Sequence, residues 1–411
     1  MSGTRLFSTA AALLAVALSS ARAEDPPQAG TVPSDPIFNA LLVDGSTASG
    51  LVRRLDDKGG VTLVSAEGAE RTIPTDRLVK LTRDGASPPT PNEWRDVVLF
   101  PDGDRLAHCK VGQAGEFNLG VQSPAFEELA VPLDSLLGLI LDPDPASVDA
   151  LTARVRSEPR DSELLWLANG DKLPGLFAGL DEKTLTFQPP TGKVELPRAG
   201  VMALGFAPGQ VVYRRPAGPF FELTLVDGSR IGVTGARLDR GRIVATTRFK
   251  AEVRLPIGDL ARVHAINASA LYLSDREASA TSYEPYIGPT RPYRRNSTVA
   301  GEAIRLGGVS YDRGLGTQSR TLMAYKLEPG SKRFQATVGV DDRAGPLGNV
   351  VFKVRVDDKI LFESPPMAAG EAPRAVDVDL AGAGLLILMT EFGERGDVQD
   401  LADWAEARII R

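Results

Sequence analysis

Residues 304–319 read IRLGGVSYDRGLGTQS, and residues 400–408, near the end of the chain, read DLADWAEAR. The first stretch breaks short apolar segments with a Gly-Gly pair and a Gly-x-Gly, which is typical of short strands joined by tight turns. Between the two stretches lie four longer segments in which apolar and polar residues alternate: 334–340, 350–356, 375–380 and 385–390. Such strands, without helices between them, predict a β-sandwich over residues 270–411.

The same stretches resemble the NPCBM/NEW2 family, whose members are carbohydrate-binding modules attached to secreted glycoside hydrolases. Residues 304–319 are similar to the family's opening signature, and residues 400–408 match its closing Asp-x-x-Asp-Trp-x-x-Ala-Arg pattern. The resemblance covers about a third of the chain and implies a galactose-binding-like jelly-roll sandwich that binds sugars without cleaving them. After Gly-Leu-Gly-Thr, where the family commonly has His, this sequence has Gln318, which can still donate and accept hydrogen bonds.

A sugar site needs an aromatic face for the ring and polar side chains for the hydroxyls, and loops at one end of a sandwich usually supply them. Residues 283–295 hold three tyrosines, three prolines and three arginines, and the prolines stiffen the segment. The predicted carbohydrate-binding residues are Tyr283, Tyr286, Tyr293, Arg294, Gln318 and Arg320. The alternative is that this segment is the first strand of the sandwich, with its tyrosines packed on the edge.

Acidic residues cluster at the predicted strand ends. Carboxylates gathered in loops can hold calcium, and Asp341, Asp342, Asp397 and Asp400 are the candidate ligands of a structural calcium ion. The alternative is that these side chains cap backbone amides or pair with arginines.

Before residue 270 the sequence repeats four times. Each copy has an apolar strand that ends in Asp-Gly or Asn-Gly, and a proline follows 27 to 29 residues after that glycine. Each copy resembles an SH3-like or Sm-like small β-barrel. The predicted units are repeats at 37–84, 94–143, 163–208 and 219–268, with a linker and short helix at 144–162. The fold class is therefore all-β, with tandem barrel-like repeats before the jelly-roll sandwich.

The sequence offers little for catalysis. It has two histidines, His108 and His264, in different repeats, and one cysteine, Cys109. Isolated histidines make a poor zinc site, so we predict a structural or surface role for both. A glycosidase needs two paired carboxylates, and no pattern in the sequence pairs them. We therefore predict that the protein is not an enzyme.

The N-terminus predicts export. Arg5, an apolar run over 6–18 and Ala-Arg-Ala at 21–23 are typical of a signal peptide over residues 1–23; an uncleaved anchor is the alternative. We expect a secreted or periplasmic protein that is free of the membrane after cleavage. The net charge is −6, with 47 basic and 53 acidic residues well mixed, which argues against nucleic acid as a partner.

Two functions remain open. The first is a secreted, non-catalytic carbohydrate-binding protein, in which the sandwich binds a glycan and the repeats act as scaffold or spacer. The second is an extracytoplasmic assembly protein without sugar binding, whose partners are other envelope proteins.

Overall fold

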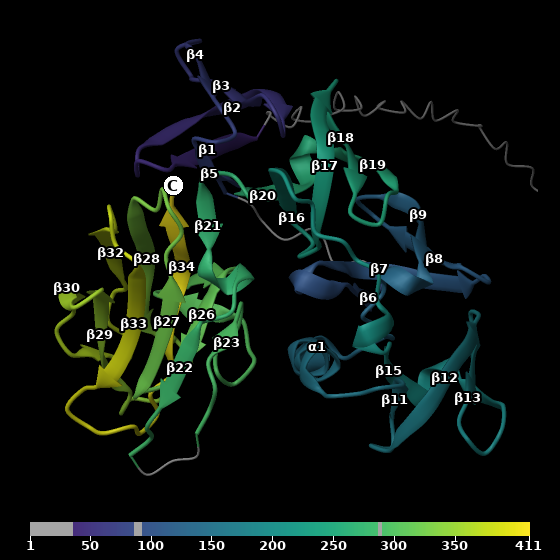
Figure 1. The fold of residues 1–411 in the computed structure, drawn as a ribbon. Helices are drawn as coiled ribbons and strands as arrows, with labels where there is room; N and C mark the ends of the chain where they lie inside the picture. Colours follow the sequence, from purple (N-terminus) through teal and green to yellow (C-terminus); the bar gives the residue numbers. More distant parts are fainter. Residues whose placement is uncertain (1–35, 86–92, 287–289) are drawn as a thin grey trace, which may run out of the picture. The chain divides into compact units, whose positions relative to one another are not determined.

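A computed structural model describes residues 36–85, 93–286 and 290–411 (Figure 1). The expected signal peptide, residues 1–23, lies outside the described residues. Residues 36–411 form one compact unit. Strands make up 53% of the structure and helices 8%, so the all-β prediction is confirmed. Of the helices in the described ranges, none is long and apolar enough to span a membrane.

The first repeat is five antiparallel strands. In chain order they are β1 (Ile37–Leu42), β2 (Thr47–Asp56), β3 (Gly60–Val64), β4 (Glu70–Ile73) and β5 (Leu78–Arg83). β1 pairs with both β2 and β5, and β3 and β4 continue from β2. The order across the sheet is therefore β5-β1-β2-β3-β4.

The three later repeats have the same strand order, with each first strand paired to both the second and the fifth. Their strands are β6 (Asp96–Leu99), β7 (Arg105–Ala114), β8 (Asn118–Ser123), β9 (Glu127–Pro132) and β10 (Gly138–Ile140); β11 (Glu163–Leu167), β12 (Lys172–Leu180), β13 (Thr184–Gln188), β14 (Val194–Pro197) and β15 (Val201–Gly205); and β16 (Phe220–Leu225), β17 (Arg230–Asp239), β18 (Arg242–Thr247), β19 (Glu252–Pro256) and β20 (Leu260–Ile266).

Local chemistry explains the repeated turn and bend. Gly45 has φ +80°, which suits the tight turn after β1, and the Asp44 carboxylate accepts the backbone N–H of Ser46 at 3.0 Å. In β2, a Cβ on Gly50 would lie 2.4 Å from the carbonyl oxygen of Val64, so only glycine lets the second strand bend this closely over the third.

The closing strands of the repeats pair with each other. β5 pairs with β20, and β10 pairs with β15. The single α-helix of the described residues, α1 (Val148–Ser157), covers the second pair by burying Leu151 and Val155 against Trp166. The first pair is covered by β21 (Ala270–Tyr272), whose Tyr272 is buried in a separate cluster.

The C-terminal sandwich has two main sheets (Figure 1). One contains β23 (Arg294–Arg295), β26 (Gly314–Thr317), β34 (Ala402–Ile410), β28 (Arg333–Val340) and β32 (Arg374–Asp379), with β21 on β34. The other contains β22 (Ala280–Tyr283), β27 (Thr321–Lys326), β33 (Leu385–Phe392), β29 (Asn349–Val356) and β30 (Lys359–Glu363), with β31 (Met367–Ala368) on β29. A small hairpin joins β24 (Ile304–Leu306) to β25 (Val309–Tyr311).

Trp404 is the centre of the sandwich core. It is fully buried and its ring packs edge-on against Phe352, with 5.2 Å between ring centroids. Its indole N–H donates to the Thr390 hydroxyl at 3.1 Å, which satisfies its one polar atom inside the core. The tryptophan of the closing sequence pattern is thus a packing residue that joins the two sheets.

Candidate functional site

Four loops meet at one end of the sandwich, the end where β26 stops and β34 begins. Thr317 pairs with Ala402, and Val340 also pairs with Ala402, so the loops after β26 and β28 and before β34 start side by side. In the second sheet, Thr321 pairs with both Tyr283 and Thr390, which brings the loop after β22 to the same end. The loop before β34 starts here too, because it follows the end of β33. This loop end is the place where a β-sandwich usually carries a binding site.

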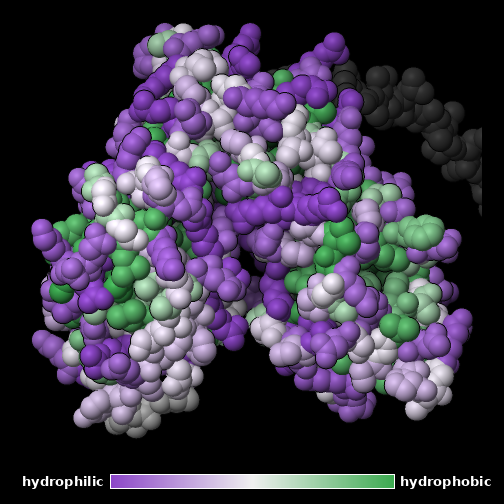
Figure 2. Space-filling view, viewed as in Figure 1, coloured by the Kyte–Doolittle hydropathy of each residue, from purple (hydrophilic) through white to green (hydrophobic). Residues whose placement is uncertain are grey.

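Tyr286 is the exposed aromatic residue of the loop end, with 71% of its surface accessible. Its ring packs edge-on against Phe392, with centroids 6.0 Å apart, and its backbone N–H donates to Asp397 at 2.8 Å. Most of the visible face of the molecule is hydrophilic, and its hydrophobic side chains form separate patches (Figure 2). An exposed ring held from behind can cover the C–H face of a sugar at little entropic cost.

Arg320 holds the polar part of the loop end. Its Nε donates to Glu391 at 3.1 Å, and its Nη1 lies 3.1 Å from a carboxylate oxygen of Glu284. Gln318 is half-buried in the same loop, two residues away. The loop end therefore combines an aromatic ring with a charged group whose donors and neighbouring acceptors suit hydroxyl groups.

Tyr283 and Tyr293 stabilise the segment that carries Tyr286. The backbone N–H of Tyr293 donates to the Tyr283 hydroxyl at 3.3 Å, and the Tyr293 hydroxyl accepts the backbone N–H of Ala278 at 3.2 Å. Tyr293 also packs on the sandwich core, and burial together with Tyr293 raises the pKa of Tyr325. These two tyrosines hold the segment that presents Tyr286.

Arg294 is directed elsewhere. Its Nη1 would lie 3.0 Å from a Cβ on Gly301, and its side chain lines a cavity that Tyr286 and Arg320 do not line. Of the six predicted residues, the structure therefore brings Tyr286, Gln318 and Arg320 to the loop end, supports them with Tyr283 and Tyr293, and separates Arg294.

Two of the predicted metal-binding carboxylates cap backbone amides. Asp341 is fully buried and accepts the backbone N–H groups of Arg305 and Arg343, each at 2.9 Å. Asp342 accepts those of Gly307 and Gly308 at 2.7 and 2.8 Å. Both carboxylates hold the loop after β28 against the β24–β25 hairpin.

The other two predicted carboxylates stabilise the loop before β34. Asp397 accepts the N–H of Tyr286, and Asp400 accepts the Ser319 hydroxyl and the backbone N–H of Asn349, the latter at 2.8 Å. Burial raises the pKa of Asp400. Within the described ranges, no group of three or more His, Cys, Asp or Glu side chains is placed to hold a metal ion, and the structural calcium ion stays a prediction.

Sequence reasoning missed three side chains of the loop end: Phe392, Glu284 and Glu391. Phe392 is the last residue of β33, and an aromatic residue directly before Gly393 was the one local signal for it. The two glutamates gave no signal, because their role depends on Arg320, which lies 36 and 71 positions away along the chain.

Comparison with known proteins concerns the sandwich. Residues 269–410 match the family described as NPCBM/NEW2 domain. The chain is 30% identical over 142 residues to a Renibacterium salmoninarum protein named as an endo-alpha-N-acetylgalactosaminidase, covering 34% of this chain and 9% of that protein. It is 25% identical over 145 residues to alpha-1,3-galactosidase B of Akkermansia muciniphila, covering 34% of this chain and 17% of that protein.

Among solved structures, the CBM51 from Clostridium perfringens GH95 in complex with methyl-galactose is 28% identical to this chain. The match covers 34% of this chain and 99% of the solved chain, with a TM-score of 0.32. The chain spans only 9% and 17% of the length of the two curated relatives. The resemblance predicted from the opening and closing sequence patterns is confirmed: residues 269–410 match the NPCBM/NEW2 domain.

Proposed function

We propose that the protein is a secreted or periplasmic, non-catalytic carbohydrate-binding protein, whose glycan site is the loop end around Tyr286. The observation that carries this proposal is a tyrosine that is 71% exposed, although its ring packs edge-on against Phe392 and its backbone N–H is bonded to Asp397. The match of residues 269–410 to the NPCBM/NEW2 domain supports it. In this proposal, the four repeats serve as the scaffold that carries the domain.

The charges at the loop end support binding without cleavage. A glycosidase needs one carboxyl group as an acid and a second as a base or nucleophile, about 5–10 Å apart across a cleft. Glu284 and Glu391 instead both pair with one guanidinium group, that of Arg320, each at 3.1 Å. Their carboxylate oxygens can accept hydrogen bonds from sugar hydroxyls.

The relatives suggest which sugars to test first. The names of the two curated relatives refer to α-linked N-acetylgalactosamine and α-1,3-linked galactose. Methyl α-galactoside and methyl α-N-acetylgalactosaminide are therefore the first ligands to titrate, with methyl α-glucoside as the comparison.

The test is calorimetric titration of residues 36–411 with each glycoside, and the key variant is Tyr286→Ala. Because the ring supplies the apolar face, we expect the dissociation constant to rise about tenfold or more, equivalent to about 1.4 kcal/mol. Phe117→Ala is the matched control, since Phe117 is 70% exposed but lies in the second repeat. Equal binding by Tyr286→Ala and the wild type would refute this site, and titration with EDTA or calcium tests the predicted ion.

One observation favours the assembly alternative. β30 is the edge strand of the second sheet, and its Ile360 and Leu361 are 50% and 47% exposed. An apolar edge strand can accept a strand from a partner protein. If co-purification identifies a specific partner protein whose binding is abolished by Ile360→Lys, and no glycan binds, the assembly function replaces the glycan function.

A further inference from the structure

The cavity that Arg294 lines has a volume of about 620 Å³, lies away from the loop end and is lined by four parts of the chain. The second repeat, α1, the fourth repeat and the sandwich all contribute to it, and six of its lining residues are arginines: Arg105, Arg156, Arg215, Arg230, Arg294 and Arg295. A cavity of this volume is in the range that holds small-molecule ligands.

The acidic side chains of this arginine cavity are largely neutralised by other cations. Asp102 accepts a hydrogen bond from Arg248 at 2.7 Å, and Asp312 is paired with Arg262. Asp275 is held by Arg313 at 2.7 Å. Asp275 also pairs with the lining Arg215 at 2.6 Å, whereas the direct partners of Asp102 and Asp312 are arginines that do not line the cavity.

Glu302 is the next lining carboxylate, and it pairs with Arg343, outside the cavity, at 3.6 Å. Asp149, in the first turn of α1, makes no ion pair with the described residues and is exposed. Asp149 is thus the acidic lining residue whose charge acts on the cavity itself.

Two of the arginines bond to carbonyl oxygens and not to carboxylates. Arg156 donates to the backbone oxygens of Phe100 and Asp104, each at 3.0 Å, and Arg105 donates its Nε to that of Gly228 at 2.9 Å. Among the described residues, neither has a carboxylate within 4 Å. Their charges are therefore fixed in place without a directly paired carboxylate.

The arginine charges act on one another. Burial, followed by the charges of Arg230 and Arg105, lowers the pKa of Arg156 to about 10. Burial and then Arg230 likewise lower the pKa of Arg105. An anion bound in the cavity would relieve this repulsion, and guanidinium groups from β7, α1 and β17 offer several donors to the oxygens of a tetrahedral anion.

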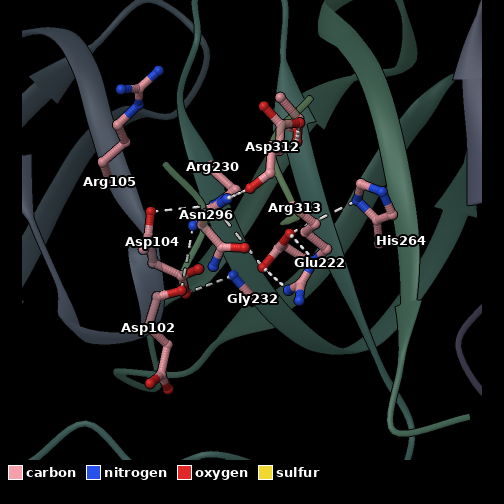
Figure 3. Close-up of polar contacts among 12 residues, drawn as sticks. Asp102, Asp104, Arg105, Glu222, Arg230, Gly232, His264, Asn296, Asp312 and Arg313 are labelled. Atoms are coloured by element: carbon pink, nitrogen blue, oxygen red, sulfur yellow. Dashed lines mark hydrogen bonds and ion pairs between the residues drawn. The ribbon is translucent and has the colours of Figure 1, made fainter. Parts of the chain in front are cut away.

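Arg230 is held rigidly at the cavity wall. It donates to the backbone oxygens of Gly103, Asp312 and Asp102 at 3.1, 3.1 and 3.3 Å. A Cβ on Gly103 would lie 1.6 Å from its Nη2, so the glycine is required for this position. Figure 3 shows Arg230 among the other side chains, while the guanidinium group of Arg105 points away from them.

We propose that the arginine cavity is an anion-binding site for a tetrahedral oxyanion, namely the sulfate or phosphate group of a small molecule, with Arg105, Arg156 and Arg230 as its main ligands. This proposal is independent of sugar binding at Tyr286, because the two sites share no lining residue.

The test is calorimetric titration of residues 36–411 with sodium sulfate, sodium phosphate and galactose 6-sulfate, at constant ionic strength maintained with sodium chloride. We expect one of these oxyanions to bind saturably, and Arg105→Gln to weaken binding about tenfold. Binding of the inorganic ions would show that the free anion suffices, whereas binding of galactose 6-sulfate alone would show that the sugar is also recognised. The absence of binding by all three would overturn the proposal.

Two variants control for indirect effects. Asp149→Asn removes an exposed carboxylate and should tighten binding several-fold without harm to the fold, so an unchanged or weaker affinity would contradict the proposal. Arg53→Gln, an exposed arginine of the first repeat, should leave binding unchanged. Tyr286→Ala should retain oxyanion binding, which distinguishes a failure of this site from a failure of the sugar site.

Discussion

Replacing Arg313 by Met should destabilise the protein strongly, because this arginine joins the fourth repeat to the sandwich (Figure 3). Its guanidinium group donates to Glu222 at 2.7 and 3.3 Å and to both carboxylate oxygens of Asp275 at 2.7 Å. It also lies over the ring of Tyr272, with 4.8 Å between its Cζ and the ring centroid. Arg313 and Glu222 are only 2% and 3% exposed, so both charges are removed from water.

The magnitude follows from what the substitution leaves behind. Burial would raise the pKa of Glu222, but the charge of Arg313, helped by Arg230 and His264, lowers it, so the carboxylate is ionised. Without Arg313, the nearest basic groups to Glu222 are His264 at 3.8 Å, which is charged only when protonated, and Arg230 at 4.0 Å. Asp275 keeps Arg215 at 2.6 Å. One buried carboxylate without a close partner costs about 3–5 kcal/mol in the free energy of unfolding.

The assay is urea unfolding of residues 36–411, followed by tryptophan fluorescence and far-UV circular dichroism, because coincident transitions justify a single free energy. The double variant Arg313→Met with Glu222→Gln should recover part of the loss, since it removes the unpaired charge. Arg333→Met is the control: Arg333 pairs with Asp377 at 2.7 Å but both are about half exposed, so the expected cost is below about 1 kcal/mol. A loss no larger than that of Arg333→Met would refute the reasoning.

Three further predictions concern buried titratable groups. Burial, and then the charge of Asp341, raises the pKa of Asp403 well above its usual value. The contribution of the protonated side chain to stability is therefore lost as the pH rises from the usual aspartate pKa through the raised one. Asp403→Asn should raise the thermal unfolding midpoint at pH 8 and flatten its fall from pH 5 to 8. Burial lowers the pKa of His264, although Glu406 opposes this, so stability should fall as the pH drops below about 6.5; His264→Gln should reduce that slope in urea unfolding at pH 4.5 to 7, and an unchanged slope would count against it. Cys109 is fully buried and burial raises its pKa, so a thiol reagent should react with it only in denaturant, and rapid reaction of the native protein would contradict the packing.

The parts of the fold that could be predicted depend on local chemistry. The bend at Gly50 and the turn at Gly45 follow from backbone sterics, which act within a few residues and leave a mark that recurs at fixed spacing. Alternation in the C-terminal segments likewise indicated strands, and the all-β class and the NPCBM/NEW2 domain are both confirmed. The SH3-like or Sm-like comparison stays a prediction.

The candidate site was harder to predict because it is assembled from distant parts of the chain. Tyr286 and Gln318 were predicted from residue type and pattern, but Phe392, which supports the tyrosine ring, lies 106 positions further on. Arg294 was grouped with Tyr293 by sequence, yet strand pairing sends its side chain into the arginine cavity. Sequence proximity therefore grouped residues that the sheet separates.

The charged residues between the repeats and the sandwich carry the least signal in the sequence, since isolated charges usually indicate solvent-exposed positions. His264 is fully buried, 3.5 Å from Glu406 of β34, and Glu406 in turn lies 3.2 Å from Lys80 of the first repeat. Burial opposes ionisation of Glu406, but Lys80 and then His264 lower its pKa well below the usual value. Each of these charges is stabilised by a partner that lies far away along the chain, so residue type and local pattern alone could not predict the cluster.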